Sequence, residues 1–406
     1  MKWISDLKSC GINDDWVNRL DILLNSNPLD GALHDIVESL RMGISLTYEQ
    51  GLILWNHPNL SDVAHLANMA KIARFDNHVF FNSNLHINQT NICTLACKFC
   101  AFRRGPKAKD AYALQVEDFI DRLTPYENII DELHTVGGLH PDWDVTYYER
   151  LFSSIKERFP DIHIKSLSAV EIKHIAEVSG LRPRDLLSRL QGAGLDSLPG
   201  GGAEILDDEV RNIICYGKES SDEYIAIHRA AHSIGMPTNC TMLFGTIETP
   251  EQRIAHLCRL RDLQAETNGF QCFVPYPYLP DNSRLPEAQL ASANEVLRVI
   301  AISRLMLDNI PHIKAYRMNI GDWMSEMALH HGADDFDGTV GHEEIMHEAG
   351  SDAIYGYSKS ELIRFIHDAK GIPVQRNSIY TKFNRYDDDD HHASISLPIS
   401  SMKVID

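Results

Sequence analysis

The stretch Cys93-Thr94-Leu95-Ala96-Cys97-Lys98-Phe99-Cys100 follows an apolar segment, residues 78–87, that has the composition of a strand. Three cysteines this close together can hold three corners of a cubane iron–sulfur cluster as thiolates. Four protein ligands would occupy every metal position, whereas three leave one metal position open for another molecule. Cysteines can also pack as small apolar residues, but polar neighbours argue against that here: Asn91, Lys98, Arg103 and Arg104. The spacing therefore predicts a [4Fe-4S] cluster on Cys93, Cys97 and Cys100.

Short apolar segments alternate with helical patterns from residue 78 onward. The candidate strands lie at 78–87, 129–136, 161–168, 195–199, 237–244, 269–276, 311–317 and 334–340. Helical stretches separate them, among them 147–159, 222–234, 249–266, 292–307 and 321–331. This alternation predicts an α/β protein with a parallel (β/α)8 TIM-type barrel. A doubly wound open sheet is the alternative, and the number of strands favours the barrel.

Three segments are expected along the chain. Residues 1–76 form an N-terminal helical extension, in which Thr47 and Gln50 make a capping box and Ser61 caps a second helix. Residues 77–370 form the barrel. Residues 371–406 form a C-terminal extension with an acidic tail around Asp387–Asp390, which we expect to be solvated.

Composition limits the possible partners. The 406-residue chain carries 57 acidic and 38 basic residues, a net charge of −19, which argues against nucleic acid and anionic membrane as bulk partners. No apolar run approaches the length of a membrane span, and the start of the chain lacks the pattern of a signal peptide. A cluster needs free thiolates and hence a reducing compartment, so we expect a cytoplasmic protein.

Glycine and polar residues follow the candidate strands. In a barrel these positions meet at the C-terminal mouth, where barrel enzymes hold their chemistry. Gly137-Gly138 permits close approach of the backbone to a ligand, and Pro199-Gly200-Gly201-Gly202 either turns sharply or offers backbone N–H groups. Glu171, after the third strand, either contacts a ligand or complements the dipole of the next helix.

These motifs resemble one branch of the radical S-adenosylmethionine (SAM) superfamily, which contains the aromatic-substrate enzymes of the futalosine route to menaquinone and the deazaflavin synthase subunits. Within the branch, the chain is most similar to the aminofutalosine (aminodeoxyfutalosine) synthases. The likeness runs from about residue 80 to 380, and its motifs lie at 136–142, 165–172, 195–205, 246–250 and 332–339. Gly137-Gly138-Leu139-His140-Pro141 and Ala333-Asp334-Asp335-Phe336-Asp337-Gly338-Thr339 favour the synthases over the dehypoxanthine futalosine cyclases. Arg317-Met318-Asn319 departs from the family pattern.

The resemblance implies specific site residues. The expected cluster and SAM residues are Cys93, Cys97, Cys100, Phe99, Gly137, Gly138, Ser168 and Glu171. The substrate candidates are His140, Gly201, Gly202, Asn239, Thr241, Arg317 and Asp335. We also expect at least one of Asp334, Asp335 and Asp337 to point into the mouth.

The implied reaction uses SAM as a co-substrate. The 5′-deoxyadenosyl radical adds to 3-[(1-carboxyvinyl)oxy]benzoate, an aromatic dicarboxylate, and aryl migration with decarboxylation gives 6-amino-6-deoxyfutalosine. A reductant protein such as flavodoxin or ferredoxin would supply the electron. The cyclase and a deazaflavin synthase subunit are alternatives from the same branch, and a non-enzymatic iron–sulfur or zinc-binding protein is the alternative from another class.

Overall fold

The computed structural model of the protein describes residues 13–26, 31–354 and 356–386. Cys10 and the acidic tail at Asp387–Asp390 lie outside these residues. The strands of the barrel are β1 (His78–Phe81), β2 (Asn84–His86), β3 (Glu132–Thr135), β4 (His163–Ser166), β5 (Thr238–Phe244), β6 (Phe270–Pro277), β7 (His312–Ala315) and β8 (Asp335–Phe336).

Parallel pairing links these strands one after another. β2, β3 and β4 form one sheet, and β5, β6, β7, β8 and β1 follow one another in a second. Single parallel bridges join the two sheets, from Lys165 of β4 to Ser197 and from Leu198 to Thr238 of β5. Since β1 and β2 are separated by only two residues, pairing passes around the barrel and returns to its start. The α/β fold that we predicted is therefore confirmed.

Most predicted strands are shorter than expected, and the predicted strand 78–87 is divided into β1 and β2; two others are reduced the most. The segment 195–199 contributes only its two bridges, and the segment 334–340 contributes only the two residues of β8. Of the remaining residues in 334–340, Thr339 bonds through its hydroxyl to the carbonyl of Asn84 in β2, and Gly338 has a φ of 92° that a regular strand does not adopt.

The chain beyond residue 371 begins with strands. β9 (Ile372–Arg376) pairs parallel to β1, and β10 (Phe383–Arg385) pairs antiparallel to β9. The first part of the C-terminal extension therefore adds two strands to the sheet, beside β1.

Helices surround the strands. They are α5 (Val116–Leu123), α6 (Val145–Arg158), α7 (Ala169–Ser179), α8 (Pro183–Ala193), α9 (Asp208–Ile214), α10 (Ser221–Ser233), α11 (Pro250–Thr267), α12 (Ala293–Met306), α13 (Arg317–Leu329), α14 (Ile345–Glu348) and α15 (Lys359–Asp368). The helices predicted at 147–159, 222–234, 249–266 and 292–307 are confirmed to within a few residues. α13 starts at Arg317, ahead of the predicted residue 321, and Gly321 bends it with a φ of 73°.

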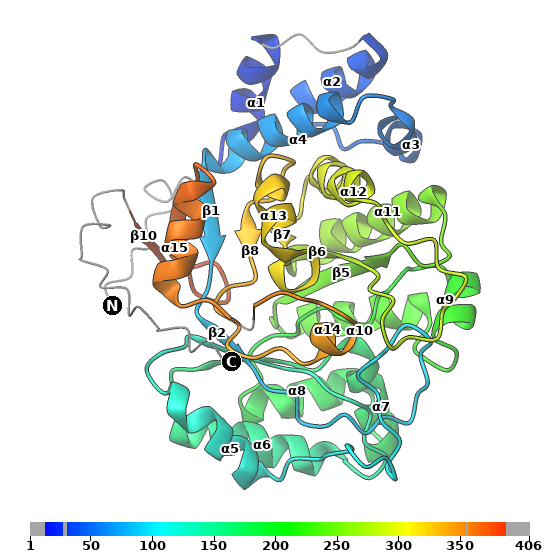
Figure 1. Ribbon diagram of the computed structural model, residues 1–406, viewed down its shortest axis with the longest axis vertical. Helices are drawn as coiled ribbons and strands as arrows, with labels where there is room; N and C mark the ends of the chain where they lie inside the picture. The colour runs from blue at the N-terminus through cyan, green and yellow to red at the C-terminus, as the bar shows by residue number, and fades with distance from the viewer. Residues whose placement is uncertain (1–12, 27–30, 355, 387–406) are drawn as a thin grey trace, which may run out of the picture.

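The N-terminal helices are α1 (Trp16–Asn25), α2 (His34–Arg41), α3 (Tyr48–Asn56) and α4 (Leu60–Phe75). Figure 1 shows them next to the start of β1, whose arrowhead points away from them, so they lie at the end of the barrel opposite the loops that follow the strands. The capping box of Thr47 and Gln50 is confirmed. The cap at Ser61 is wrong, because Asn59 is the N-cap of α4 and its side chain accepts the Ser61 N–H at 3.0 Å.

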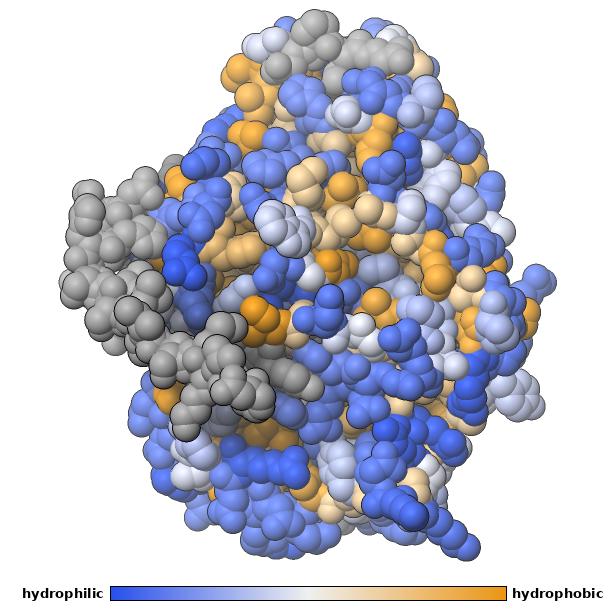
Figure 2. Space-filling view, viewed as in Figure 1, coloured by the Kyte–Doolittle hydropathy of each residue, from blue (hydrophilic) through white to orange (hydrophobic). Residues whose placement is uncertain are grey.

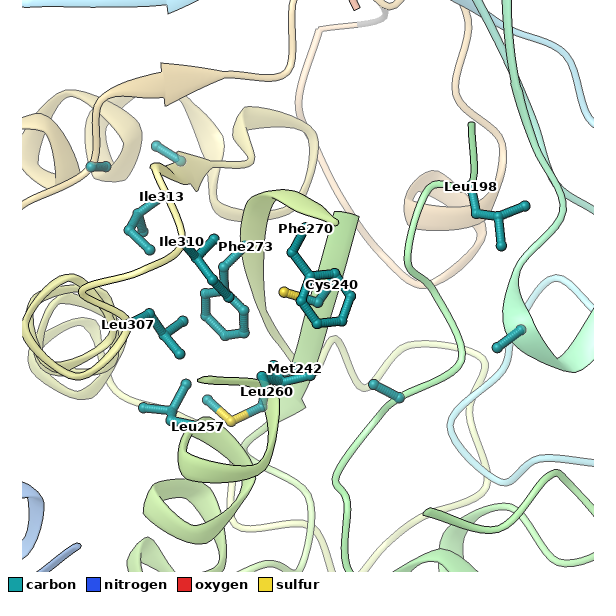
Figure 3. Packing of buried hydrophobic residues seen from close by; sticks show 14 of the residues in the cluster. Leu198, Cys240, Met242, Leu257, Leu260, Phe270, Phe273, Leu307, Ile310 and Ile313 are labelled. Atoms are coloured by element: carbon teal, nitrogen blue, oxygen red, sulfur yellow. The ribbon is translucent and has the colours of Figure 1, made fainter. Parts of the chain in front are cut away.

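Apolar side chains from the strands and the outer helices fill the space between them. Figure 3 shows Phe273 of β6 packed near Leu307 and Ile310, with Met242 of β5 near Leu257 and Leu260 of α11. Each fully buried side chain of this size contributes about 2 kcal/mol. The outer surface is more polar: in Figure 2 the lower part of the face, over α5, α6 and α8, is mostly hydrophilic. No helix among the described residues has the length and apolar character needed to cross a membrane.

Candidate active site

The cysteine loop, residues 87–115, connects β2 to α5. Hydrogen bonds close its cysteine segment on itself: the Cys93 N–H donates to the Arg104 carbonyl at 3.1 Å, and the Arg104 N–H donates to the Asn91 carbonyl at 2.7 Å. The Thr94 N–H donates to the Leu139 carbonyl at 3.1 Å, which ties the loop to the segment after β3.

Arg284, after β6, holds the middle of the loop. Its Nη2 donates to the carbonyls of Ala96 at 3.0 Å and Cys97 at 3.1 Å, and its own N–H donates to the Lys98 carbonyl at 2.7 Å. On the other side, the Lys98 N–H donates to the Ile214 carbonyl at the end of α9 at 2.7 Å. The three cysteines therefore sit on a loop whose backbone is fixed from two directions.

The three thiols fit an iron–sulfur cluster. All are free; Cys97 is buried and the other two are partly exposed. Burial raises the pKa of Cys100, while backbone N–H groups of Arg103 and Phe102 bond to its sulfur and favour the thiolate. No group of His, Cys, Asp or Glu among the described residues surrounds a single metal ion. A cubane does not need such a group, since each cysteine binds a different iron.

Gly137 and Gly138 follow β3 and pack against the cysteine loop. The Gly138 N–H donates to the Thr90 carbonyl at 2.8 Å. A Cβ added to Gly138 would lie 2.6 Å from the carbonyl carbon of Ile92, closer than real Cβ atoms come to backbone. Gly138 is therefore needed for close contact with the loop, while Gly137 is the one that lines the pocket described below.

Glu171 connects α7 to this glycine pair. It forms the capping box of α7 with Ser168, whose N–H and hydroxyl donate to Oε2 at 2.7 and 2.6 Å. Its Oε1 accepts the Gly137 N–H at 3.0 Å and Gln89 Nε2 at 2.9 Å. Burial raises the pKa of this carboxyl. Both oxygens are thus occupied by the protein, which matches the helix-capping alternative for this residue.

A deep pocket opens where the strands end, with a cavity volume of about 260 Å³. Eight of the expected site residues line it: Phe99, Cys100, Gly137, Ser168, Glu171, Gly201, Gly202 and Thr241.

The triple-glycine segment forms one wall. The Gly200 carbonyl accepts the hydroxyls of Tyr224 at 2.8 Å and Thr241 at 3.0 Å. The buried Arg211 donates to the Gly202 carbonyl at 3.2 Å and from Nε to the Glu219 carbonyl at 3.1 Å. These bonds fix a backbone that has positive φ at Gly200 and Gly202.

Lys218 is a pocket residue that the sequence did not indicate. Its ammonium pairs with Glu204 and lies 5.6 Å from the centre of the Phe99 ring. Burial alone would lower the pKa of Lys218, but Glu204 and Glu219 raise it above its usual range, so the side chain stays charged. Gly217-Lys218-Glu219 joins α9 to α10 and follows no strand, which is why the pattern of strand ends could not find it.

Another part of the pocket carries neutral polar groups. His86 Nε2 and His134 Nδ1 are 3.2 Å apart, and burial lowers the pKa of both, to about 4 for His134. Tyr276 and Tyr316 meet edge to face at 5.2 Å. Asn88 and Asn319 complete this part, and the Oδ1 of each is buried with no hydrogen-bond partner among the described residues.

Other expected residues lie outside the pocket lining: Cys93, Cys97, Gly138, His140, Asn239, Arg317 and Asp335. The His140 ring stacks on Trp143 at 4.5 Å. Arg317 is buried, with Nε 3.8 Å from Asp337 and its guanidinium 4.4 Å from the Tyr357 ring centre.

The acidic segment after Gly332 does not behave as expected. Asp334 bonds to Arg304 and to the Ile313 N–H, Asp335 to Arg376 and Tyr380, and Asp337 to the Met318 N–H. None of the three lines the pocket. A buried carboxylate is costly unless it is paired, and partners on neighbouring elements turn these side chains away from the mouth.

Comparisons with known proteins agree with this geometry. The Radical SAM superfamily profile matches residues 87–260, and the profile of the CofH/MqnC C-terminal region matches residues 267–388. The chain is 38% identical to an aminodeoxyfutalosine synthase of Streptomyces coelicolor, covering 89% of this chain and 96% of that protein. It is 35% identical to a cyclic dehypoxanthine futalosine synthase of the same organism, covering 88% and 90%. The solved methylornithine synthase PylB shares the fold at a TM-score of 0.67 and 18% identity, covering 84% of this chain and 97% of that one.

Proposed function

Because this chain belongs to the radical SAM superfamily, in the branch with the CofH/MqnC C-terminal region, we propose that it is an aminodeoxyfutalosine synthase of menaquinone biosynthesis. The 5′ carbon of SAM is joined to the enol-ether double bond of 3-[(1-carboxyvinyl)oxy]benzoate. Aryl migration and loss of one carboxylate as CO2 or bicarbonate then give 6-amino-6-deoxyfutalosine. The observation that carries the proposal is a single pocket that is lined both by Phe99 and Cys100 of the cysteine segment and by tyrosines and neutral polar groups.

Cys93, Cys97 and Cys100 would hold the [4Fe-4S] cluster and leave one iron for the amino and carboxylate groups of SAM. When bound, the cluster supplies the electron that splits SAM into methionine and the 5′-deoxyadenosyl radical. The backbone at Gly137 lies where the methionine part would enter, and Glu171 holds that backbone in place. Phe99 offers a ring face to the adenine, and Lys218 offers its charge to the SAM carboxylate.

The substrate would occupy the part of the pocket between His86 and Tyr316. Lys218 is the only lysine or arginine among the described residues that line the pocket. With Lys218 assigned to SAM, the two substrate carboxylates would bind neutral donors: the hydroxyls of Tyr276 and Tyr316, the amides of Asn88 and Asn319, and the imidazoles. The low pKa of His134 keeps its ring neutral at pH 7, when it can donate from one nitrogen and accept at the other.

Apolar side chains close the pocket on the remaining side. Tyr278, Leu279, Ile345 and Met346 contribute to this wall. Glu343 shapes it, because its carboxylate accepts the Ile345 N–H at 3.0 Å and the Met346 N–H at 2.6 Å. A primary carbon radical must be kept from water, and such an apolar wall excludes water from the pocket.

The test is the fate of the adenosyl carbon. The reconstituted, reduced enzyme is given SAM labelled with ¹³C at the 5′ position together with 3-[(1-carboxyvinyl)oxy]benzoate. We expect the label in 6-amino-6-deoxyfutalosine. A parallel reaction with dehypoxanthine futalosine is the control for the cyclase alternative. Label found only in free 5′-deoxyadenosine, with turnover of dehypoxanthine futalosine, would contradict the synthase and favour the cyclase.

A further inference from the structure

The segment around the last cluster cysteine is strongly basic. Within residues 98–109 there is no acidic residue, and there are these basic ones: Lys98, Arg103, Arg104, Lys107 and Lys109. The whole chain has a net charge of −19, so this segment opposes the field of the rest of the molecule. Lys107 and Lys109 are exposed, and no hydrogen bond or ion pair among the described residues engages them.

A second pocket lies beside Cys100, between this segment and the residues around Arg284 and Glu348. Three arginines line it, Arg103, Arg104 and Arg284, together with Glu348. Arg104 donates to the Ala101 carbonyl at 2.7 Å and to Glu348 at 2.9 Å, so that its position is fixed. The Nε of Arg103 is buried with no partner among the described residues. The pocket therefore has excess positive charge and a free donor for a carboxylate.

The surface continues on the other side of the loop with apolar side chains. The bond between the Lys98 N–H and the Ile214 carbonyl holds the end of α9 against the loop. Here Tyr216 is 81% exposed and Ile213 is 47% exposed. An exposed tyrosine beside charged groups is a common anchor of protein interfaces, and electron-transfer encounters use small ones, below about 1,200 Å².

We propose that this outer face of the cysteine loop is the docking surface for a small acidic protein that carries one electron at low potential. The inference rests on the proposed function, since only a cluster on the three cysteines needs the electron. The carrier loses one electron and the cluster gains it; no bond forms and no proton moves. Because electron transfer slows steeply with distance, docking next to Cys100 brings the carrier close to a cluster ligand. The basic segment attracts an acidic carrier while the remaining surface repels it.

The experiment compares Lys107→Glu/Lys109→Glu with wild type in two readouts. The first is the Kd for an acidic flavodoxin, measured at low salt on the reconstituted protein. The second is the rate of SAM cleavage driven by reduced flavodoxin or by dithionite, which is too small to need a docking surface. We expect the Kd to rise about tenfold, the flavodoxin-driven rate to fall by a similar factor, and the dithionite-driven rate to stay within about twofold.

The matched control is Arg364→Glu/Lys382→Glu, which makes the same charge change on α15 and between β9 and β10, outside both pockets. We expect it to leave both readouts near wild type. An equal loss in the control, an unchanged Kd in the Lys107/Lys109 variant, or a parallel loss of the dithionite-driven rate would each overturn the docking surface. Failure of the proposed function would be seen in the labelling experiment, as absence of the ¹³C label from 6-amino-6-deoxyfutalosine. It would not change the Kd for flavodoxin.

Discussion

Lys218 decides the charge of the pocket. Its pair with Glu204 and the charge of Glu219 keep it an ammonium, so it can bind the carboxylate of SAM. We expect Lys218→Met to raise the Kd for SAM roughly 10- to 100-fold, since a charge-assisted hydrogen bond contributes about 1.5–3 kcal/mol. Equilibrium dialysis on the reconstituted protein measures it. Lys173→Met, in a partly exposed pair with Glu223, is the control and should bind SAM as wild type does. Equal SAM affinity in both variants would show that Lys218 does not bind SAM.

Glu219 should make stability depend on pH. Burial raises the pKa of this carboxyl from 4.5 to about 7, and both oxygens lack a hydrogen-bond partner among the described residues. Between about pH 4.5 and 7 the folded protein therefore binds more protons than the unfolded chain, so stability falls as pH rises and levels off above pH 7. Relative to Glu219→Gln, wild type should lose about 3 kcal/mol over this range. Urea unfolding at pH 5, 6, 7 and 8 measures the difference, and parallel curves would contradict the shift.

At the level of elements, contact between the segment after β3 and the cysteine loop positions the cluster residues. The backbone of Gly138 touches Ile92, just before Cys93. From the sequence, Gly138 is expected among the residues that bind the cluster or SAM. The structure gives it a packing role, because a side chain at Gly138 would push on the loop that carries the cysteines.

We expect Gly138→Ala to lower the iron bound per chain at least about twofold and to destabilise the protein by about 1–3 kcal/mol, the usual cost of overpacking. The control is Gly201→Ala, whose Cβ would lie 3.6 Å from the Ser168 Cβ, an ordinary contact. This variant should load iron normally. The measurements are iron and sulfide content after anaerobic reconstitution, and thermal unfolding. Normal iron content in Gly138→Ala would show that the loop can move aside.

At the scale of the whole molecule, buried ion pairs join distant parts of the chain around the barrel. Arg376 of β9 makes two bonds to Asp335 of β8, at 2.6 and 2.9 Å, although β1 lies between these strands. Burial alone would raise the pKa of Asp335, but Arg376 and Lys314 lower it to about 2. The C-terminal strands are thereby fastened to the last strand of the barrel.

Arg376→Met should destabilise the protein by about 3–5 kcal/mol, because it leaves a buried carboxylate without its main partner. Asp335→Asn in the same chain should recover part of the loss. Arg158→Met is the control, since its pair with Glu127 is exposed and should contribute less than about 1 kcal/mol. Urea unfolding compares the variants. A loss in Arg376→Met no larger than in the control would show that the C-terminal strands are not needed for barrel stability.

The features that could be predicted from the sequence depend on near neighbours. Periodicity located most of the strands and five of the helices around them, since alternating and 3.6-residue patterns are set within a few residues. The capping box at Thr47 and the spacing of Cys93, Cys97 and Cys100 are local in the same sense. Local patterns were least reliable where several neighbouring residues could serve as the N-cap of one helix. At the start of α4, Asn59 is the N-cap, although Ser61 could also have capped a helix.

Which polar side chains face the pocket depends on the tertiary structure. Lys218 reaches the pocket from a segment that follows no strand, and His86 and His134 reach it from inside predicted strands. Arg317 ends one predicted strand and Asp335 lies in another, and both turn away from the pocket. The reason is energetic. A buried charge must find an opposite charge, and for Asp335 that charge is Arg376, 41 residues further along the chain. Such pairing depends on how strands are arranged around the barrel, which no short stretch of sequence specifies.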